Sequence, residues 1–248
     1  MLMAVDIRRA LDPVQLARDA GIEPDPWQAE LLHERPRRCL MLCARQTGKT
    51  EVAFHLGLWT CLYEPGSLVL IVSPSQRQSQ EVFRRLMLAH AKLQGVPELQ
   101  QESALRAQFA NGSRVLALPG SEKTTRGYAA AHMVIIDEAA RVDDELLAAL
   151  RPTMATVDGS LIALSTPFGK RGWFYDAWVG DESWTRVRVP ASECPRISKA
   201  FLDDERRELG AMRFSEEYEF AWNEPDESMF PTAIIDRAFT SDVRPLWR

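Results

Sequence analysis

The residues best placed to do chemistry begin with Lys49, in the run Gly48-Lys49-Thr50. This run follows an apolar stretch, residues 39–42, and precedes a segment that we expect to be helical. A buried strand that enters a Gly-Lys-Thr turn and then a helix is typical of a phosphate-binding loop. In such a loop Gly48 lets the backbone approach the phosphates, Lys49 reaches the β- and γ-phosphates, and Thr50 offers a hydroxyl to Mg²⁺.

One residue departs from the general pattern of such loops. Position 43 is normally glycine, and this chain has Cys43. Taken alone, the segment could therefore be a chance Gly-Lys-Thr at the start of a helix. A second segment is needed to decide between the two readings.

That second segment is the apolar run 133–136, which ends in Asp137-Glu138. In a parallel sheet its carboxylates would lie at the same edge as the phosphate-binding loop. We expect Asp137 to hold Mg²⁺, through water, and Glu138 to orient and deprotonate the attacking water, because a tightly metal-bound carboxylate is a poor base. A strand that ends in a solvated acidic turn is the alternative. The two segments in this order favour binding and hydrolysis of a nucleoside triphosphate.

Two weaker signals accompany these segments. Ser165 and Thr166 follow the apolar run 161–164 and could sense a γ-phosphate, although a capped turn before a helix is an equally ordinary reading. Gln28 lies upstream of the loop, and a glutamine amide matches the donor–acceptor edge of adenine. A residue on a surface helix is the alternative for Gln28.

The elements that must position these residues alternate between strands and helices. Apolar runs at 39–42, 68–72, 133–136 and 161–164 predict strands, and helical periodicity follows the first two. The character of the chain changes after residues 185–189. Residues 105–118 predict a hairpin, with Asn111 and Gly112 as the two positive-φ residues of a tight turn. We therefore predict an α/β fold with a mainly parallel sheet flanked by helices. We expect a core over residues 1–190 and a small lid or linker subdomain over residues 191–248.

Composition limits the possible partners and compartments. The 248 residues carry a formal net charge of −5, so the protein is not a module that coats DNA by charge alone. No apolar stretch reaches the ~18 residues needed to span a bilayer, and the N-terminus does not resemble a signal peptide. We expect no membrane association and a cytoplasmic location. The four cysteines lack metal-ligand spacing and are expected to be reduced core thiols.

Taken in order, these motifs resemble the ATPase domain of the large terminase subunits of tailed bacteriophages. The resemblance covers roughly residues 25–235, and no single motif in it is specific, but the series is. Cys43 is ordinary in this family. The shared features are Gln28, the loop Arg45-Gln46-Thr47-Gly48-Lys49-Thr50, Ser73-Pro74, Asn111-Gly112-Ser113, Arg126-Gly127, Asp137-Glu138-Ala139-Ala140 and Ser165-Thr166-Pro167.

The resemblance implies a P-loop NTPase of the additional-strand, catalytic-glutamate type that uses ATP and Mg²⁺. Gln28 would contact adenine, and the six loop residues 45–50 would bind the phosphates. Arg45 would face the γ-phosphate in the same subunit, whereas Arg126 would be inserted into a neighbour's active site. A surface arginine at 126 and a loop-stabilising salt bridge at Arg45 are the alternatives. Ser165 and Thr166 would couple hydrolysis to DNA movement.

The resemblance also implies partners. Large terminase subunits form a ring, usually of five copies, on the portal vertex of an empty capsid and drive double-stranded DNA inward. Expected partners are therefore DNA, the portal protein, the small terminase subunit and further copies of this chain. Expected locations are the host cytoplasm and, transiently, the procapsid portal vertex. Family members normally continue into a nuclease domain, for which we find no acidic cluster, so we expect no DNA cutting from this chain.

Two other functions remain open at this stage. A two-lobed helicase or translocase would need a second motor lobe, for which 248 residues are too few. A nucleotide-binding adaptor without turnover would leave Glu138 without a purpose. Strand displacement would favour the first, and tight ATP binding without phosphate release would favour the second.

Overall fold

A computed structural model describes residues 2–120, 127–180, 183–222 and 237–238. It contains an eight-stranded sheet with the order β3-β4-β5-β2-β6-β7-β1-β8. The pairings from β5 through β8 are parallel, and only β3–β4 and β4–β5 are antiparallel. The predicted α/β fold with a mainly parallel sheet is confirmed. The strands are β1 Arg38–Cys43, β2 Leu68–Ser73, β3 Leu99–Ser103, β4 Arg106–Phe109, β5 Arg114–Pro119, β6 Met133–Asp137, β7 Ser160–Ser165 and β8 Thr185–Val189.

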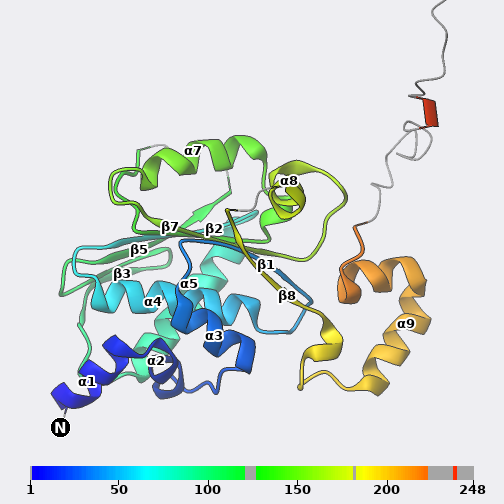
Figure 1. The fold of residues 1–248 in the computed structure, drawn as a ribbon. Coiled ribbons are helices and arrows are strands. Elements are labelled where there is room, and N and C mark those ends of the chain that lie inside the picture. Colours follow the sequence, from blue (N-terminus) through cyan, green and yellow to red (C-terminus); the bar gives the residue numbers. More distant parts are fainter. Residues whose placement is uncertain (1, 121–126, 181–182, 223–236, 239–248) are drawn as a thin grey trace, which may run out of the picture.

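Helices cover both faces of the sheet, which makes three layers (Figure 1). The five N-terminal helices lie on one face and α7 and α8 lie on the other, while α9 stands apart from both helical layers. The α-helices are α1 Leu2–Leu11, α2 Pro13–Asp19, α3 Pro26–Glu34, α4 Lys49–Tyr63, α5 Gln76–Lys92, α7 Asp144–Met154, α8 Gly172–Gly180 and α9 Lys199–Phe214. Three further helical turns are η1 Ala139–Arg141, η2 Ala191–Glu193 and η3 Ser215–Glu219.

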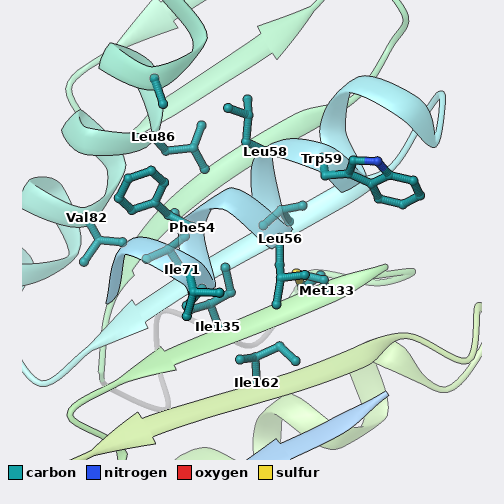
Figure 2. Close-up of a cluster of buried hydrophobic side chains, with 14 of the residues drawn as sticks. Phe54, Leu56, Leu58, Trp59, Ile71, Val82, Leu86, Met133, Ile135 and Ile162 are labelled. Carbon is teal, nitrogen blue, oxygen red and sulfur yellow. The ribbon is translucent and has the colours of Figure 1, made fainter. Parts of the chain in front are cut away.

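The sheet separates two hydrophobic clusters. On the α4 face, Phe54 of α4 packs with Ile71 of β2, Ile135 of β6 and Ile162 of β7, together with Leu86 of α5 (Figure 2). The alternate residues of the same strands point into the second cluster, beneath α7 and α8. Central strands buried on both faces explain why their sequences are continuous apolar runs rather than alternating ones. This core holds the carboxyl ends of the strands in fixed register.

The order of the central strands determines the class of the fold. Strand β7 is inserted between β1, which precedes the phosphate-binding loop, and β6, which ends in Asp137. Leu164 of β7 pairs with Asp137, and Ser165 pairs with Leu42 of β1. The additional strand that the family resemblance implied is therefore present, and it brings Ser165 between the two halves of the candidate site.

The predicted hairpin is present, but its turn differs from the expected one. Only Gly112 has a positive φ (84°), and Asn111 is not among the positive-φ residues. Asn111 instead donates side-chain hydrogen bonds to the carbonyls of Cys61 and Leu62, which ends α4. Asn111 thus satisfies carbonyl groups at the end of α4, about fifty residues earlier in the chain. The sequence around Asn111 does not indicate this contact. Strand β3, which pairs with β4, was not predicted.

The segment after β8 packs against the rest of the chain through aromatic residues. Phe214, Tyr218 and Phe220 are buried and belong to the cluster beneath α7 and α8. The division into residues 1–190 and 191–248 stays a prediction. All four cysteines are buried and free, and none of the helices in the described part of the chain is long and apolar enough to cross a membrane.

Candidate active site

The loop between β1 and α4 has the backbone of a phosphate-binding turn. Gly48 has φ 87° and Gln46 has φ 63°, in the left-handed region that glycine adopts freely. The Thr47 hydroxyl donates to the Ala44 carbonyl at 2.8 Å, which closes the turn from inside. A Cβ on Gly48 would lie 2.5 Å from Nε2 of Gln28, so no larger residue fits without moving that side chain. Helix α4 then begins at Lys49 with its free N–H groups facing the loop.

The loop and the acidic pair, far apart in sequence, meet in space. Lys49 Nζ lies 3.4 Å from Glu138 Oε1 and 3.5 Å from the Cys43 carbonyl. The Lys49 side chain is 9% exposed and that of Glu138 is 25% exposed. A lysine held between a loop carbonyl and a carboxylate is placed where the phosphates of a nucleotide would lie. The predicted convergence of these two groups is therefore present in the fold.

Asp137 is the more buried carboxylate of the pair. Burial, followed by the neighbouring charge of Glu138, raises the pKa of Asp137 to about 6, while Lys49 and the hydroxyl of Thr50 act in the opposite direction. A buried carboxylate at a strand end beside a threonine hydroxyl is the oxygen donor set that Mg²⁺ takes in such sites, with phosphates and water as its remaining ligands. The residues fit the ion. No group of three or more His, Cys, Asp or Glu side chains that could hold a metal occurs among the described residues.

Glu138 has an unusual backbone. Its φ is 52° and its ψ is 45°, a left-handed conformation that costs of order 1 kcal/mol for a non-glycine residue. Its N–H donates to Asp137 Oδ1 at 3.1 Å. This turn directs consecutive side chains to different places, so that Asp137 stays buried while Glu138 reaches Lys49.

Ser165 and Thr166 lie between the two halves of the site. Both residues are buried, and the Ser165 hydroxyl accepts a hydrogen bond from the Ala140 N–H at 3.2 Å. The end of β7 is therefore bonded directly to the turn that carries Glu138. The coupling role of Ser165 and Thr166 stays a prediction.

Gln28 lies beside the loop, and its side-chain amide is hydrogen-bonded to other residues of the protein. Its Oε1 accepts from the Asp25 N–H at 2.9 Å, and its Nε2 donates to the Gly48 carbonyl at 3.1 Å. These bonds tie α3 to the phosphate-binding loop. The contact of Gln28 with adenine stays a prediction. The structure shows in addition that Gln28 supports the phosphate-binding loop.

Arg196 was not singled out by its sequence context, yet it also supports the loop. Its guanidinium donates to the Thr47 carbonyl at 3.0 Å and to Asp25 Oδ1 at 2.7 Å. The neighbouring residues 190–195 contain two prolines after β8, and nothing in them indicates a contact with a loop more than a hundred residues away. Only the position of β8 beside β1 brings Arg196 to the site.

Arg45 pairs with a distant carboxylate. Its guanidinium donates to both oxygens of Glu217 in η3, at 2.5 and 3.0 Å. The predicted contact of Arg45 with a γ-phosphate stays a prediction, and so do the phosphate contacts of Gln46 and Thr47. Arg126, predicted to act in a neighbouring subunit, lies outside the described residues.

The strand order, the loop and the acidic pair together define a P-loop NTPase of the additional-strand class. Comparison with known proteins identifies the family within this class to which the chain belongs. Residues 40–230 match the family described as terminase large subunit, T4likevirus-type, N-terminal. The match covers more than half of the chain, so the chain belongs to this family.

Two curated relatives are similar to the chain in sequence, and two solved structures are similar to it in fold. The large terminase subunits of Thermus phage G20c and Thermus virus P23-45 are each 28% identical over 178 residues, which cover 64% of this chain and 36% of theirs. The chain thus spans a little over a third of their length. The ATPase domain of the Thermus phage P74-26 large terminase superposes with a TM-score of 0.72 at 22% identity, covering 83% of this chain and 96% of that one. The large terminase of the thermophilic bacteriophage D6E in complex with ADP gives 0.64 at 10% identity, covering 85% and 53%.

Proposed function

We propose that the chain is the ATP-hydrolysing, Mg²⁺-dependent motor domain that powers translocation of double-stranded viral DNA into a procapsid. The observation that carries the proposal is the approach of Lys49 to Glu138, at the carboxyl edge of a sheet with the additional strand. The D6E terminase, which shares the fold, has been solved in complex with ADP, and this supports nucleotide binding by the chain. Membership of the terminase large subunit family supports the packaging role.

Different side chains of the site bind the phosphates, hold the metal ion and activate the attacking water. Lys49 and the N–H groups at the start of α4 bind the β- and γ-phosphates. Thr50 and Asp137 would hold Mg²⁺, which neutralises charge on the phosphates when it is bound. Glu138 orients the attacking water and accepts its proton. Glu138 contacts Lys49 and is more exposed than Asp137. When the phosphates bind Lys49, the Glu138 side chain therefore has room to leave the lysine and contact the attacking water.

The remaining assignments follow from the family resemblance and are part of the proposal. Arg45 approaches the γ-phosphate in the same subunit, and Arg126 supplies positive charge to the neighbouring site, where an arginine finger contributes about 10³–10⁵ in rate. Gln28 contacts adenine, and Ser165 and Thr166 transmit hydrolysis to the DNA. Copies of the chain assemble into a ring, with five as the expected number, at the portal vertex of the procapsid. The portal protein and the small terminase subunit are the partners of this ring, and the chain otherwise resides in the host cytoplasm.

Steady-state phosphate release tests the site. We expect Mg²⁺-dependent ATP turnover that is reduced by about 10²-fold or more in Lys49→Ala and in Glu138→Ala. Binding of a fluorescent ATP analogue should be lost in Lys49→Ala and kept in Glu138→Ala. The exposed Glu208 of α9 offers a matched control, since Glu208→Ala should leave both measurements unchanged. Parental turnover in both site variants would refute the assignment.

A further inference from the structure

Two segments near Glu138 are joined at three points. The first runs from Glu138 through η1 to the first turn of α7, and the second runs from the end of β7 to the start of α8. The Ala140 N–H bonds the Ser165 hydroxyl at 3.2 Å, and the Trp173 N–H bonds Asp144 Oδ1 at 2.8 Å. The third contact lies between these two and is made by Arg141.

Arg141 touches both the catalytic carboxylate and the second segment. Its Nε lies 3.9 Å from Glu138 Oε2, on the opposite carboxylate oxygen from the one that faces Lys49. Its guanidinium carbon lies 4.1 Å from the centre of the Phe168 ring. Arg171 approaches the same ring at 5.2 Å, so the ring is held by two guanidinium groups. Arg141 is therefore fixed by Phe168 while its Nε faces Glu138.

Glu138 needs such a support. Its backbone is in the left-handed region, its side chain is 25% exposed, and its other partner, Lys49, is the group that phosphates would take away. Once Lys49 turns to a nucleotide, Arg141 is the remaining cation within 4 Å of this carboxylate among the described residues. A carboxylate that must align a water molecule loses rate steeply when its position is loose.

We propose that Arg141 is a positioning residue for Glu138 and that Phe168 fixes Arg141, so that the segment after β7 determines whether the carboxylate is aligned. This inference rests on the proposed function, because it assigns Glu138 to water activation. It adds a second connection between the end of β7 and the reacting atoms, beyond the Ser165 hydroxyl. Movement of residues 166–171 is thereby linked to hydrolysis through the Arg141–Phe168 contact.

The test separates alignment of Glu138 from nucleotide binding. We expect Arg141→Ala to lower kcat for ATP by about 10- to 100-fold while the dissociation constant of a fluorescent ATP analogue stays within about twofold of the parent. Phe168→Leu, which keeps an apolar side chain and removes the ring, should lower kcat in the same direction. Phe168→Tyr, which keeps the ring, should restore it. The matched control is Arg151→Ala, an exposed arginine on α7 that makes none of the contacts with Glu138 or Phe168 described above.

The double variant provides the sharper measurement. If Phe168 acts through Arg141, the loss of kcat in Arg141→Ala with Phe168→Leu should equal that of Arg141→Ala alone. The proposal would be overturned if the loss of kcat in the double variant equalled the product of the two single losses. It would also be overturned if Arg141→Ala had the same kcat as Arg151→Ala, or if Arg141→Ala weakened analogue binding as much as it lowered kcat. A loss of turnover matched by loss of folded protein in thermal unfolding would overturn it as well. Lys49→Ala is measured in parallel: if it too retains parental turnover, the proposed function fails, whereas a flat Arg141 series with an inactive Lys49→Ala refutes only the positioning role.

Discussion

At the scale of single residues, the site depends on two adjacent carboxylates in different environments. Asp137 is 9% exposed at the end of a central strand, whereas the left-handed turn at Glu138 brings the next side chain outward to Lys49. Carboxylates whose environments differ in this way take different chemical roles. The buried one is suited to metal binding and the more exposed one to proton transfer.

Asp137 can be tested through magnesium rather than through turnover. In the parent we expect Mg²⁺ to raise the melting temperature beyond the rise that ADP gives alone. Asp137→Asn should keep the ADP-dependent rise and lose the Mg²⁺-dependent one, because a neutral amide is a weak ligand for this ion. Asp143→Asn, an exposed carboxylate in the same segment, is the control. A full Mg²⁺ effect in Asp137→Asn would exclude the residue as a ligand.

The same measurement should depend on pH in the parent. Because burial raises the pKa of Asp137 to about 6, protons compete with Mg²⁺ as the pH falls through that value. The Mg²⁺-dependent rise should therefore be complete near pH 8 and weaken below about pH 6. A rise of the same size at pH 5 and pH 8 would contradict the role of a buried carboxylate.

At the scale of elements, the loop-bearing helix α4 is buried along most of its length, and it contains a buried histidine. His55 is 1% exposed; its Nδ1 bonds the Glu51 carbonyl and its Nε2 has no partner among the described residues. Burial lowers the pKa of His55 to about 4. Below pH 6.5 the unfolded chain binds a proton at this residue that the folded chain does not, so this residue makes the protein less stable as the pH falls towards 4.

Replacing His55 should remove that acid sensitivity. In urea unfolding, His55→Leu should reduce the loss of folding free energy between pH 7 and pH 4.5 by up to about 3 kcal/mol. His33→Leu, at an exposed histidine, is measured in parallel as the control for loss of an imidazole. An unchanged pH dependence in His55→Leu would mean that the histidine is protonated in the folded chain.

A second element-scale prediction concerns η3, whose Glu217 holds Arg45. If Arg45 also contacts a γ-phosphate, the two anions compete for one guanidinium. Glu217→Gln should then strengthen binding of an ATP analogue relative to ADP. The Arg45 side chain is 60% exposed, so the ion pair is worth at most about 1 kcal/mol and the change should not exceed about fivefold.

Calorimetry with the ATP analogue and with ADP measures the ratio of their two affinities. Glu208→Gln on α9 controls for a general change of charge in the C-terminal segment. An equal change in ATP and ADP affinity would place Arg45 away from the γ-phosphate.

At the scale of the whole molecule, the proposed ring requires residues from two copies in one site. Arg126→Ala and Glu138→Gln should each lower ATP turnover when assayed alone. Mixed in equal amounts, they should regain activity, because about a quarter of the interfaces in a random ring pair an intact Arg126 with an intact Glu138. The measurement is phosphate release as a function of total protein concentration. Turnover of the mixture equal to the mean of the two variants at every concentration would exclude a finger from a neighbouring copy.

The chemistry of the site is largely encoded in short stretches of sequence. Gly48-Lys49-Thr50 and Asp137-Glu138 each follow an apolar strand, and the rule that parallel strands end at a common edge predicts that both groups lie at that edge of the sheet. The strand–helix alternation likewise predicts a parallel sheet. These features depend on neighbouring residues, which is why they can be identified without the fold.

The supports of the site are decided by tertiary structure. Arg196 reaches the loop because β8 pairs with β1, Arg45 meets Glu217 across 172 residues, and Arg141 meets Phe168 because β7 lies beside β6. Each contact depends on strand order and on packing between segments far apart in the chain, and these are set by the burial of the whole core rather than by any local pattern. The sequence determined which groups could act on a nucleotide, and the fold determined which groups hold them in place.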